Sequence, residues 1–190
     1  MLNRIYLPRA IIGDNVENNK VMCILLDGAP FDVFSRLARK GILPNMQKLM
    51  RNGCSNVLNS TIPSVSPVAI PSLLTGKNPG KHGIFGFGYM ENGTLRPYTS
   101  MKLVGETIWD RLAAAKKKVI LLNVPWTYPP FKVNGIMVSG FPSPRNIVRS
   151  YPPEIVSILK SKIGQYYLDV NVKNVNFAGA DEESFIEDAY

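Results

Sequence analysis

The sequence predicts an α/β fold in which helices flank a mostly parallel sheet. Two patterns carry this prediction: short apolar runs typical of strands buried on both faces, and amphipathic segments of helical spacing between them. The chain has 190 residues, of which 45% are hydrophobic and 19% charged, as in ordinary globular domains. A chain of this length is long enough to bury a hydrophobic core.

In the first half of the chain, each expected element has its own local signal. Residues 1–20 are polar and irregular, so we expect an extension in front of the domain that occupies 21–190. The run VMCILL at 21–26 predicts a buried strand, and CSNVL at 54–58 predicts a second short strand. Helical spacing that ends at a glycine occurs three times, at 31–40, 45–52 and 67–75.

The second half alternates helix and strand patterns, which is the order expected for a parallel sheet. The segment ETIWDRLAAA at 106–115 is amphipathic and precedes the apolar run KVILLN at 118–123. The other expected strands lie at 136–139 and 166–172, and the other expected helices lie at 153–162 and from Asp181 onward.

Composition also limits where the protein resides. No segment approaches the ~18 consecutive apolar residues of a membrane-spanning helix. The N-terminal residues lack the apolar stretch of a signal peptide, so we expect a cytoplasmic protein without a membrane span. Cys23 and Cys54 lie in apolar or strand-like surroundings and show no metal-ligand spacing, which predicts reduced, buried thiols.

The charge is basic and unevenly distributed. The net charge is +8, although five of the 14 acidic residues lie between Asp181 and Asp188. The rest of the chain therefore attracts anions such as phosphates. The sequence contains no RNA-binding aromatic motif, zinc finger or helix-turn-helix signature, so a dedicated nucleic-acid role is not predicted.

Asp27 directly follows the first apolar run and is itself followed by Gly28. Ligands of open parallel sheets gather at the carboxyl ends of the strands, where a hard carboxylate can bind a divalent cation. Asp-Gly pairs are equally common in turns. The residues alone leave both interpretations of Asp27 open, metal ligand or turn residue.

Ser66 precedes Pro67, the residue expected to begin the helix at 67–75, and is therefore the expected N-cap. At this place the positive end of the helix dipole stabilises a developing alkoxide, and an adjacent divalent metal would stabilise it further. Backbone N–H groups at the helix start could also receive a phosphoryl group. On spacing alone, a plain capping role is the simpler interpretation.

The only histidine of the chain, His82, lies in the glycine-rich segment GKHGIFGFG. A triad of Ser66, His82 and Asp27 is not supported, because no G-x-S-x-G elbow surrounds the serine and the chain order fits no hydrolase elbow. The glycines also lack the lysine pattern of a phosphate-binding loop. We therefore expect His82 to make a structural hydrogen bond.

Six blocks along the chain carry a resemblance: ILLDGAP, LPNMQKLMRNG, STIPSVSPVAIPSLLTGKNPGKHGIFGF, TIWDRLAAAKKKVILLNVPWTYPP, GIMVSGFPSP and YPPEIVSILKSKIGQYYLDV. In this order they resemble the alkaline phosphatase superfamily and, more narrowly, the type I phosphodiesterase/nucleotide pyrophosphatase family. The resemblance covers roughly residues 20–190. It implies an alkaline-phosphatase-like core that hydrolyses phosphate esters or anhydrides at two divalent metals, usually zinc, with manganese as an alternative.

The resemblance also implies roles for single residues. Asp27 matches the first metal-binding Asp of the family, and Ser66 matches the nucleophile, which is transiently phosphorylated and is a ligand of the same metal. The segment NVPWTYPP falls where family members build part of the substrate pocket. Trp126 and Tyr128 are therefore candidates for packing on a leaving group, and a core role for both is the alternative.

Two departures from the family pattern modify this expectation. Ala69 stands where nucleotide pyrophosphatases commonly hold a phosphate-binding Asn, which argues against assigning a nucleotide substrate. The remaining metal ligands of the family are later Asp and His residues, whereas this chain has one histidine. Because a zinc site needs about three or four protein ligands, Asp27 and Ser66 cannot assemble the centre alone. We expect a truncated, N-terminal portion of a phosphoesterase that binds at most one metal weakly and is inactive alone.

Other functions remain open at this point. A non-catalytic α/β module that binds anions or nucleotides at the helix start of Ser66 is the main alternative, and a phosphomutase-like member of the superfamily is another. A sulfatase is not expected, since no C-x-P-x-R or S-x-P-x-R signature surrounds Ser66. The expected partner is a phosphorylated small molecule. Truncation would expose apolar residues such as Phe185 and Ile186, which favours self-association or docking.

Overall fold

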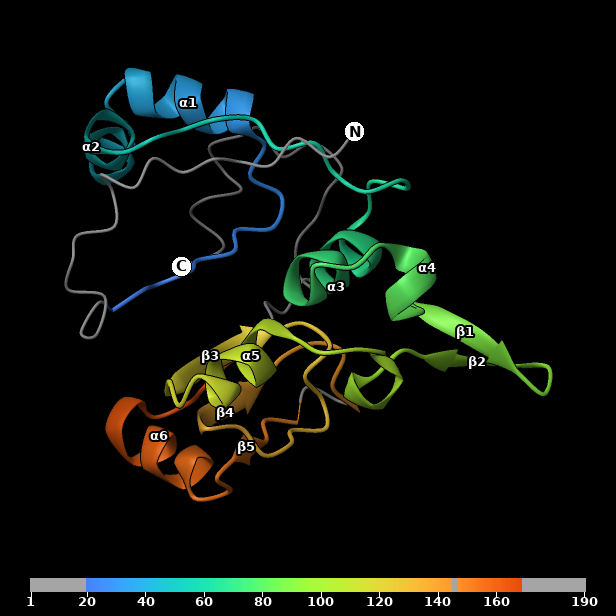
Figure 1. Cartoon of the computed structure of the whole chain (residues 1–190). Coiled ribbons are helices and arrows are strands. Elements are labelled where there is room, and N and C mark those ends of the chain that lie inside the picture. Colours follow the sequence, from blue (N-terminus) through green and yellow to red (C-terminus); the bar gives the residue numbers. More distant parts are fainter. Residues whose placement is uncertain (1–19, 145–146, 169–190) are drawn as a thin grey trace, which may run out of the picture. The chain divides into compact units, whose positions relative to one another are not determined.

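The computed structural model describes residues 20–144 and 147–168 and contains both helices and strands, which confirms the predicted α/β class (Figure 1). The chain divides into two compact units, one up to Val57 and one from Leu58 onward. Within the described ranges, no helix is long and apolar enough to cross a membrane.

The first unit contains two helices, α1 (Phe31–Arg39) and α2 (Pro44–Asn52), as the helical spacing predicted. The connection is tight: Gly41 has a φ of +79°, and the backbone N–H of Ile42 donates to the carbonyl of Leu37 over 3.1 Å. Ala38 is buried on the inner face of α1. Proline at the first position of α2 costs no hydrogen bond, because that N–H has no partner within a helix.

Both strands predicted for this part of the chain are wrong. Residues 21–26 and 54–58 belong to no strand, and all are exposed. A continuous apolar run becomes a buried strand only where neighbouring strands pair with its backbone on each side. Cys23 and Cys54 lie in these two segments, so the expected burial of both thiols is wrong as well, although neither forms a disulfide.

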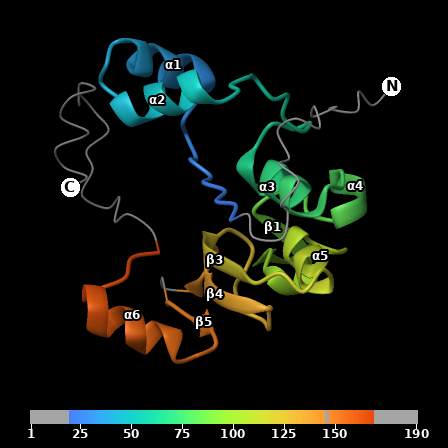
Figure 2. The same cartoon turned by 60° about the vertical axis from the view of Figure 1, so that its left-hand side comes forward.

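The second unit holds the remaining helices and all the described strands. The helices are α3 (Ser66–Thr75), α4 (Pro79–His82), the 3₁₀ helix η3 (Ser100–Lys102), α5 (Ile108–Ala114) and α6 (Ile155–Ile163). Helices α3 and α4 are neighbours (Figure 2). The three longer helices lie where the sequence predicted them, with boundaries shifted by one or two residues, as is usual for helix ends.

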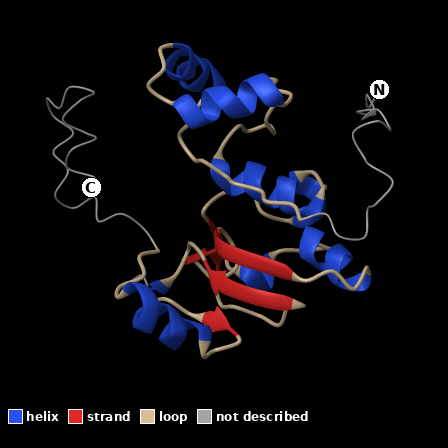
Figure 3. Cartoon of the chain, turned by 90° about the vertical axis from the view of Figure 1, so that its left-hand side faces the viewer, coloured by secondary structure: helices blue, strands red, loops and turns tan. Residues whose placement is uncertain are grey.

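The main sheet is small and mixed. Its strand order is β3 (Val119–Val124), β4 (Gly135–Ser139) and β5 (Ser150–Tyr151), with β3–β4 parallel and β4–β5 antiparallel. Helix α5 contacts β3, and α6 contacts β4 and β5 (Figure 3). The parallel pair matches the two predicted strands at 118–123 and 136–139. The expected burial on both faces is wrong for β3, because Ile120 and Leu122 are exposed. Residues 166–168 of a third predicted strand are not in a strand, and its remainder and the helix from Asp181 lie outside the described residues.

A hairpin of β1 (Gly88–Glu91) and β2 (Thr94–Pro97) was not predicted. Its turn is Asn92-Gly93, with φ of +50° and +75°, which is the commonest two-residue hairpin turn. The Asn-Gly pair was the available sequence signal.

Two hydrophobic clusters form the core of this unit. One is built on Leu74, Trp109 and Val119, and the other on Ile84, Tyr98 and Trp126. Ile70 of α3 packs against both clusters. Helix α3 is therefore anchored to the sheet side and to the glycine-rich side of the unit by one side chain.

Candidate active-site residues

Ser66 is the first residue of α3 rather than its N-cap. Val65 occupies the cap, with an extended backbone of φ −125° and ψ 145°, and its carbonyl accepts from the N–H groups of Val68 and Ala69. Because proline has no N–H, Pro67 at the second position leaves the first turn without a loss. The predicted cap is thus shifted by one residue, and half-buried Ser66 still lies at the positive end of the helix.

The side of α3 that follows Ser66 is firmly packed. Pro67, Val68 and Pro71 are buried, and Val68 has no exposed surface. Ser72 donates to the carbonyl of Val68 over 2.9 Å, and its oxygen lies 2.9 Å from Nε2 of His82. The structural hydrogen bond expected of His82 is confirmed.

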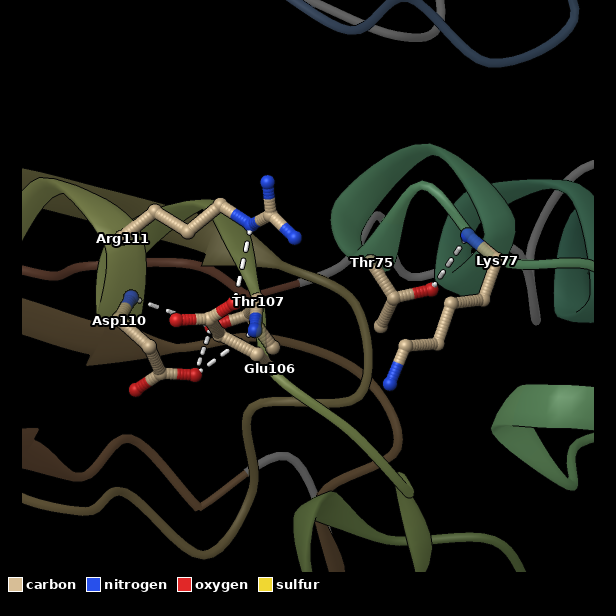
Figure 4. Close-up of polar contacts among 6 residues, drawn as sticks. All are labelled: Thr75, Lys77, Glu106, Thr107, Asp110 and Arg111. Atoms are coloured by element: carbon tan, nitrogen blue, oxygen red, sulfur yellow. Dashed lines mark hydrogen bonds and ion pairs between the residues drawn. The ribbon is translucent and has the colours of Figure 1, made fainter.

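The C-terminal end of α3 meets the beginning of α5 (Figure 4). Thr75 donates to the carbonyl of Pro71 over 2.7 Å and accepts from the N–H of Lys77 over 3.2 Å. The Lys77 side chain passes so close to Gly105 that a Cβ at this glycine would collide with it. At the start of α5, Thr107 and Asp110 form a reciprocal capping box. Local hydrogen bonds therefore fix both the C-terminal end of α3 and the start of α5.

Asp27 lies in the first unit, in a turn with Gly28. The N–H of Gly28 donates to Oδ1 of Asp27 over 3.1 Å, and Gly28 has a φ of +68° that other residues adopt with strain. The carboxylate is exposed. This geometry agrees with the turn interpretation of Asp27 and leaves its carboxylate accessible to solvent. Asp27 and Ser66 belong to different units, so their pairing stays a prediction.

Trp126 lies just after the carboxyl end of β3 and is buried in the core beside Ile84 and Tyr98. Its backbone N–H donates to the carbonyl of Phe141 over 2.6 Å. The indole Nε1 is buried and finds no hydrogen-bond partner within 20–144 and 147–168. The core role left open for Trp126 is thus realised, and direct contact with a substrate stays a prediction.

Tyr128 is half-buried two residues later. Its carbonyl accepts from the N–H of Ser100 over 2.8 Å, and the hydroxyl of Ser100 donates to the carbonyl of Pro129 over 2.8 Å. These bonds tie the loop to η3 and hold its backbone in place. Of the two aromatic candidates, Tyr128 keeps the larger accessible surface.

The structure adds residues at the carboxyl end of the parallel β3–β4 pair that the sequence did not single out. Asn123 and Trp126 have φ of +52° and +62°, a conformation that costs energy and is often found at functional sites. Thr127 donates to the carbonyl of Val124 and accepts from the N–H of Gly140, so it joins the ends of β3 and β4. An Asn at the carboxyl end of a predicted strand was the available signal.

Asn123 also binds a distant segment. The hydroxyl of Tyr166 donates to Oδ1 of Asn123 over 2.8 Å, and Nδ2 of Asn123 donates to the carbonyl of Tyr167 over 3.3 Å. Burial raises the pKa of Tyr166 above its ordinary 10.0, so the phenol stays a donor at neutral pH. A polar cluster therefore lies at the carboxyl end of the parallel pair, where ligands of such sheets gather.

Comparison with known families decides the relationship. The model of the type I phosphodiesterase / nucleotide pyrophosphatase family matches residues 21–184. The chain belongs to this family. Membership confirms the resemblance to the alkaline phosphatase superfamily and indicates a hydrolase of the phosphodiesterase or pyrophosphatase type that acts on phosphorylated small molecules. The chain matches no curated protein and no solved structure.

Proteins of this family are generally metal-dependent, so we asked whether the residues present fit a metal. In the part of the chain that the structure describes, no three His, Cys, Asp or Glu side chains converge as a metal site. Asp27 and Ser66 would supply two oxygen ligands, fewer than a zinc site needs. The described residues alone do not fit a complete zinc site.

Proposed function

We propose that the chain carries the nucleophile half of a phosphodiesterase or pyrophosphatase active site, with Ser66 as the nucleophile. The supporting observation is the family match across 21–184, which includes Ser66 at the start of a firmly packed helix. In the proposed reaction the Ser66 oxygen bonds to phosphorus, the bond to the leaving alcohol or phosphate breaks, and water later hydrolyses the phosphoserine.

Asp27 is proposed as a metal ligand of the same site, together with Ser66. Zinc is the expected metal and manganese the alternative. Since two ligands are too few, we propose that these 190 residues bind a metal weakly and have little or no hydrolase activity alone. Tyr128, and less directly Trp126, are proposed to pack on the leaving group. Self-association and a cytoplasmic location stay predictions.

The test measures phosphate binding to the 190-residue chain by calorimetry, with and without zinc. Binding that requires zinc and disappears in Asp27→Asn and Ser66→Ala supports the proposal. Asp32→Asn and Ser64→Ala are matched controls at exposed positions nearby and should bind as the original chain does. Zinc-dependent binding that survives both site variants would contradict the assignment of these residues.

Hydrolysis is measured separately with bis(p-nitrophenyl) phosphate and added zinc or manganese. We expect no turnover above that of the metal alone. Robust cleavage that is lost in Ser66→Ala would overturn the proposed inactivity and would support Ser66 as the nucleophile. Binding of nucleotides without any metal would instead favour a non-catalytic anion-binding module, an alternative that the net charge of +8 supports.

A further inference from the structure

His82 joins three segments of the second unit. It ends helix α4 and has no exposed surface. Its ring lies between Ser72 of α3, at 2.9 Å from Nε2, and the N–H of Ile84, at 3.2 Å from Nδ1. Its carbonyl accepts from the N–H of Val104 over 3.2 Å. One buried residue thus connects α3, the glycine-rich segment and the loop before α5.

The donors and acceptors around the ring select one tautomer. The N–H of Ile84 can only donate, so Nδ1 must accept and carries no proton. The proton of a neutral ring is then on Nε2, which donates to the oxygen of Ser72. The hydroxyl of Ser72 in turn donates a hydrogen bond to the carbonyl of Val68 over 2.9 Å. The three hydrogen bonds therefore run from Ile84 to His82, from His82 to Ser72, and from Ser72 to Val68 in the first turn of α3.

We propose that neutral His82 is a positioning residue that fixes the first turn of α3, and with it Ser66, through Ser72 and Val68. Val68 is two residues after Ser66 and fully buried, so the chain of bonds ends next to the proposed nucleophile. The functional part of this inference rests on the proposed role of Ser66. The bonds themselves do not, and they can be tested without any hydrolysis.

Protonation of the ring would break this arrangement. The added proton would be on Nδ1, so two donors, Nδ1–H and the Ile84 N–H, would point at each other. The surrounding charges would not compensate. Helix α3 carries no charged residue, and the basic neighbours in sequence are Lys77, Lys81 and Lys102. The acidic neighbour Glu106, two residues after Val104, is paired with Arg111. The ammonium of Lys102 lies over the ring of Tyr89 and near Glu91. Within the described ranges, no carboxylate pairs with His82.

Burial lowers the pKa of His82 below its ordinary 6.5, while a backbone hydrogen bond with Val68 acts in the opposite direction. Both the geometry and this direction keep the ring neutral at pH 7. The first turn of α3 should therefore be fixed at neutral pH and should loosen on acidification.

The first experiment is a pH titration of the ¹⁵N-labelled 190-residue chain by NMR. Since the chain has one histidine, its imidazole signals need no assignment by mutation. We expect the Nε2–H tautomer at pH 7.5 and a midpoint below 6.5. The amide signals of Ile84 and of residues 68–72 should shift with the same midpoint, whereas those of α6 should not. The Nδ1–H tautomer, or α3 amides that do not follow the ring, would overturn the proposal.

The second experiment measures amide hydrogen exchange in variants at pH 7.5. Ser72→Ala removes the link and should speed exchange in the first turns of α3 about 2- to 10-fold, the usual contribution of one hydrogen bond. His82→Gln keeps a donor near Nε2 and should exchange more slowly in this turn than His82→Ala. Ser161→Ala, which removes a similar bond to the carbonyl of Ile158 on α6, should leave α3 unchanged.

Equal exchange in α3 for Ser72→Ala and Ser161→Ala would contradict the positioning role. The pH titration of Ser66→Ala separates the two proposals, because it does not depend on the role of Ser66. The positioning role stands if the His82 ring and the α3 amides titrate together in this variant. The proposed function fails independently if the original chain shows no zinc-dependent phosphate binding. If the binding stands but α3 does not follow His82, the positioning role fails.

Discussion

The helix that begins at Ser66 and the apolar run that leads to Asp27 differ in where their backbone N–H and C=O groups find hydrogen-bond partners. Both segments are apolar in sequence, and each leads to or from a proposed site residue. Helix α3 makes its own backbone hydrogen bonds and buries Val68 and Leu74, whereas residues 21–26 pair with no strand and stay exposed. A helix is complete within its own segment, while a strand depends on neighbours elsewhere in the chain.

The largest expected effect comes from a buried charge. Val68→Asp places a carboxylate at a position without exposed surface, so we expect the second unit to lose about 4 kcal/mol or more of unfolding free energy. Ile24→Asp, at a position of the first unit that is 70% exposed, should change the unfolding free energy of that unit by less than about 0.5 kcal/mol. Urea unfolding followed by far-UV circular dichroism measures both variants, since each unit contains helices. Equal effects would contradict the contrast between the two segments.

The glycines that follow the two segments, Gly76 and Gly28, should also differ in how much their replacement by alanine lowers the unfolding free energy. Gly76 is the left-handed C-cap of α3, with φ +64°, so Gly76→Ala should cost about 1–2 kcal/mol. Gly28 has φ +68°, but it lies in an exposed turn that can relax, so Gly28→Ala should cost less in the same circular dichroism assay. A larger loss for Gly28→Ala would show that the turn at Asp27 is held more firmly than its exposure indicates.

Helix starts allow a finer comparison within the second unit. Thr107→Ala removes the capping box of α5 and should cost about 1 kcal/mol. Helix α3 has Val65 at its cap, so Val65→Ser should add about 0.5–1 kcal/mol, because the extended backbone of Val65 suits a capping serine. Thermal unfolding followed by circular dichroism compares the two variants. A destabilised Val65→Ser protein would indicate that the Val65 side chain contributes packing.

The smallest expected effect is the dependence of stability on pH. Because burial lowers the pKa of His82, the unfolded chain binds more protons than the folded unit as the pH falls below 6.5. The contribution of His82 to stability is therefore fully present above about pH 6.5 and decreases as the pH falls toward its folded pKa. Urea unfolding between pH 7.5 and 5.5 should show this loss, and His82→Gln should reduce it. An unchanged slope in the variant would assign the effect to carboxylates.

Local signals in the sequence determined most of the helices. The spacing and terminal glycines of α1 and α3, the proline that begins α2 and the amphipathic pattern of α5 all predicted helices that the structure contains. The sequence blocks from Ile24 to Val170 were sufficient to identify the family, which the match over 21–184 confirms. These features depend on nearby residues and on their order, so they can be recognised without a structure.

Only the tertiary structure decided which apolar runs become strands and where single side chains are buried. Runs 21–26 and 118–123 look alike in sequence, yet only the second pairs with a neighbour, because pairing depends on distant residues. The bonds of His82 to Ser72 and Ile84, and those of Asn123 to Tyr166 and Tyr167, also cross turns or long loops. No local pattern specifies such contacts, since they form only after packing has brought their partners together.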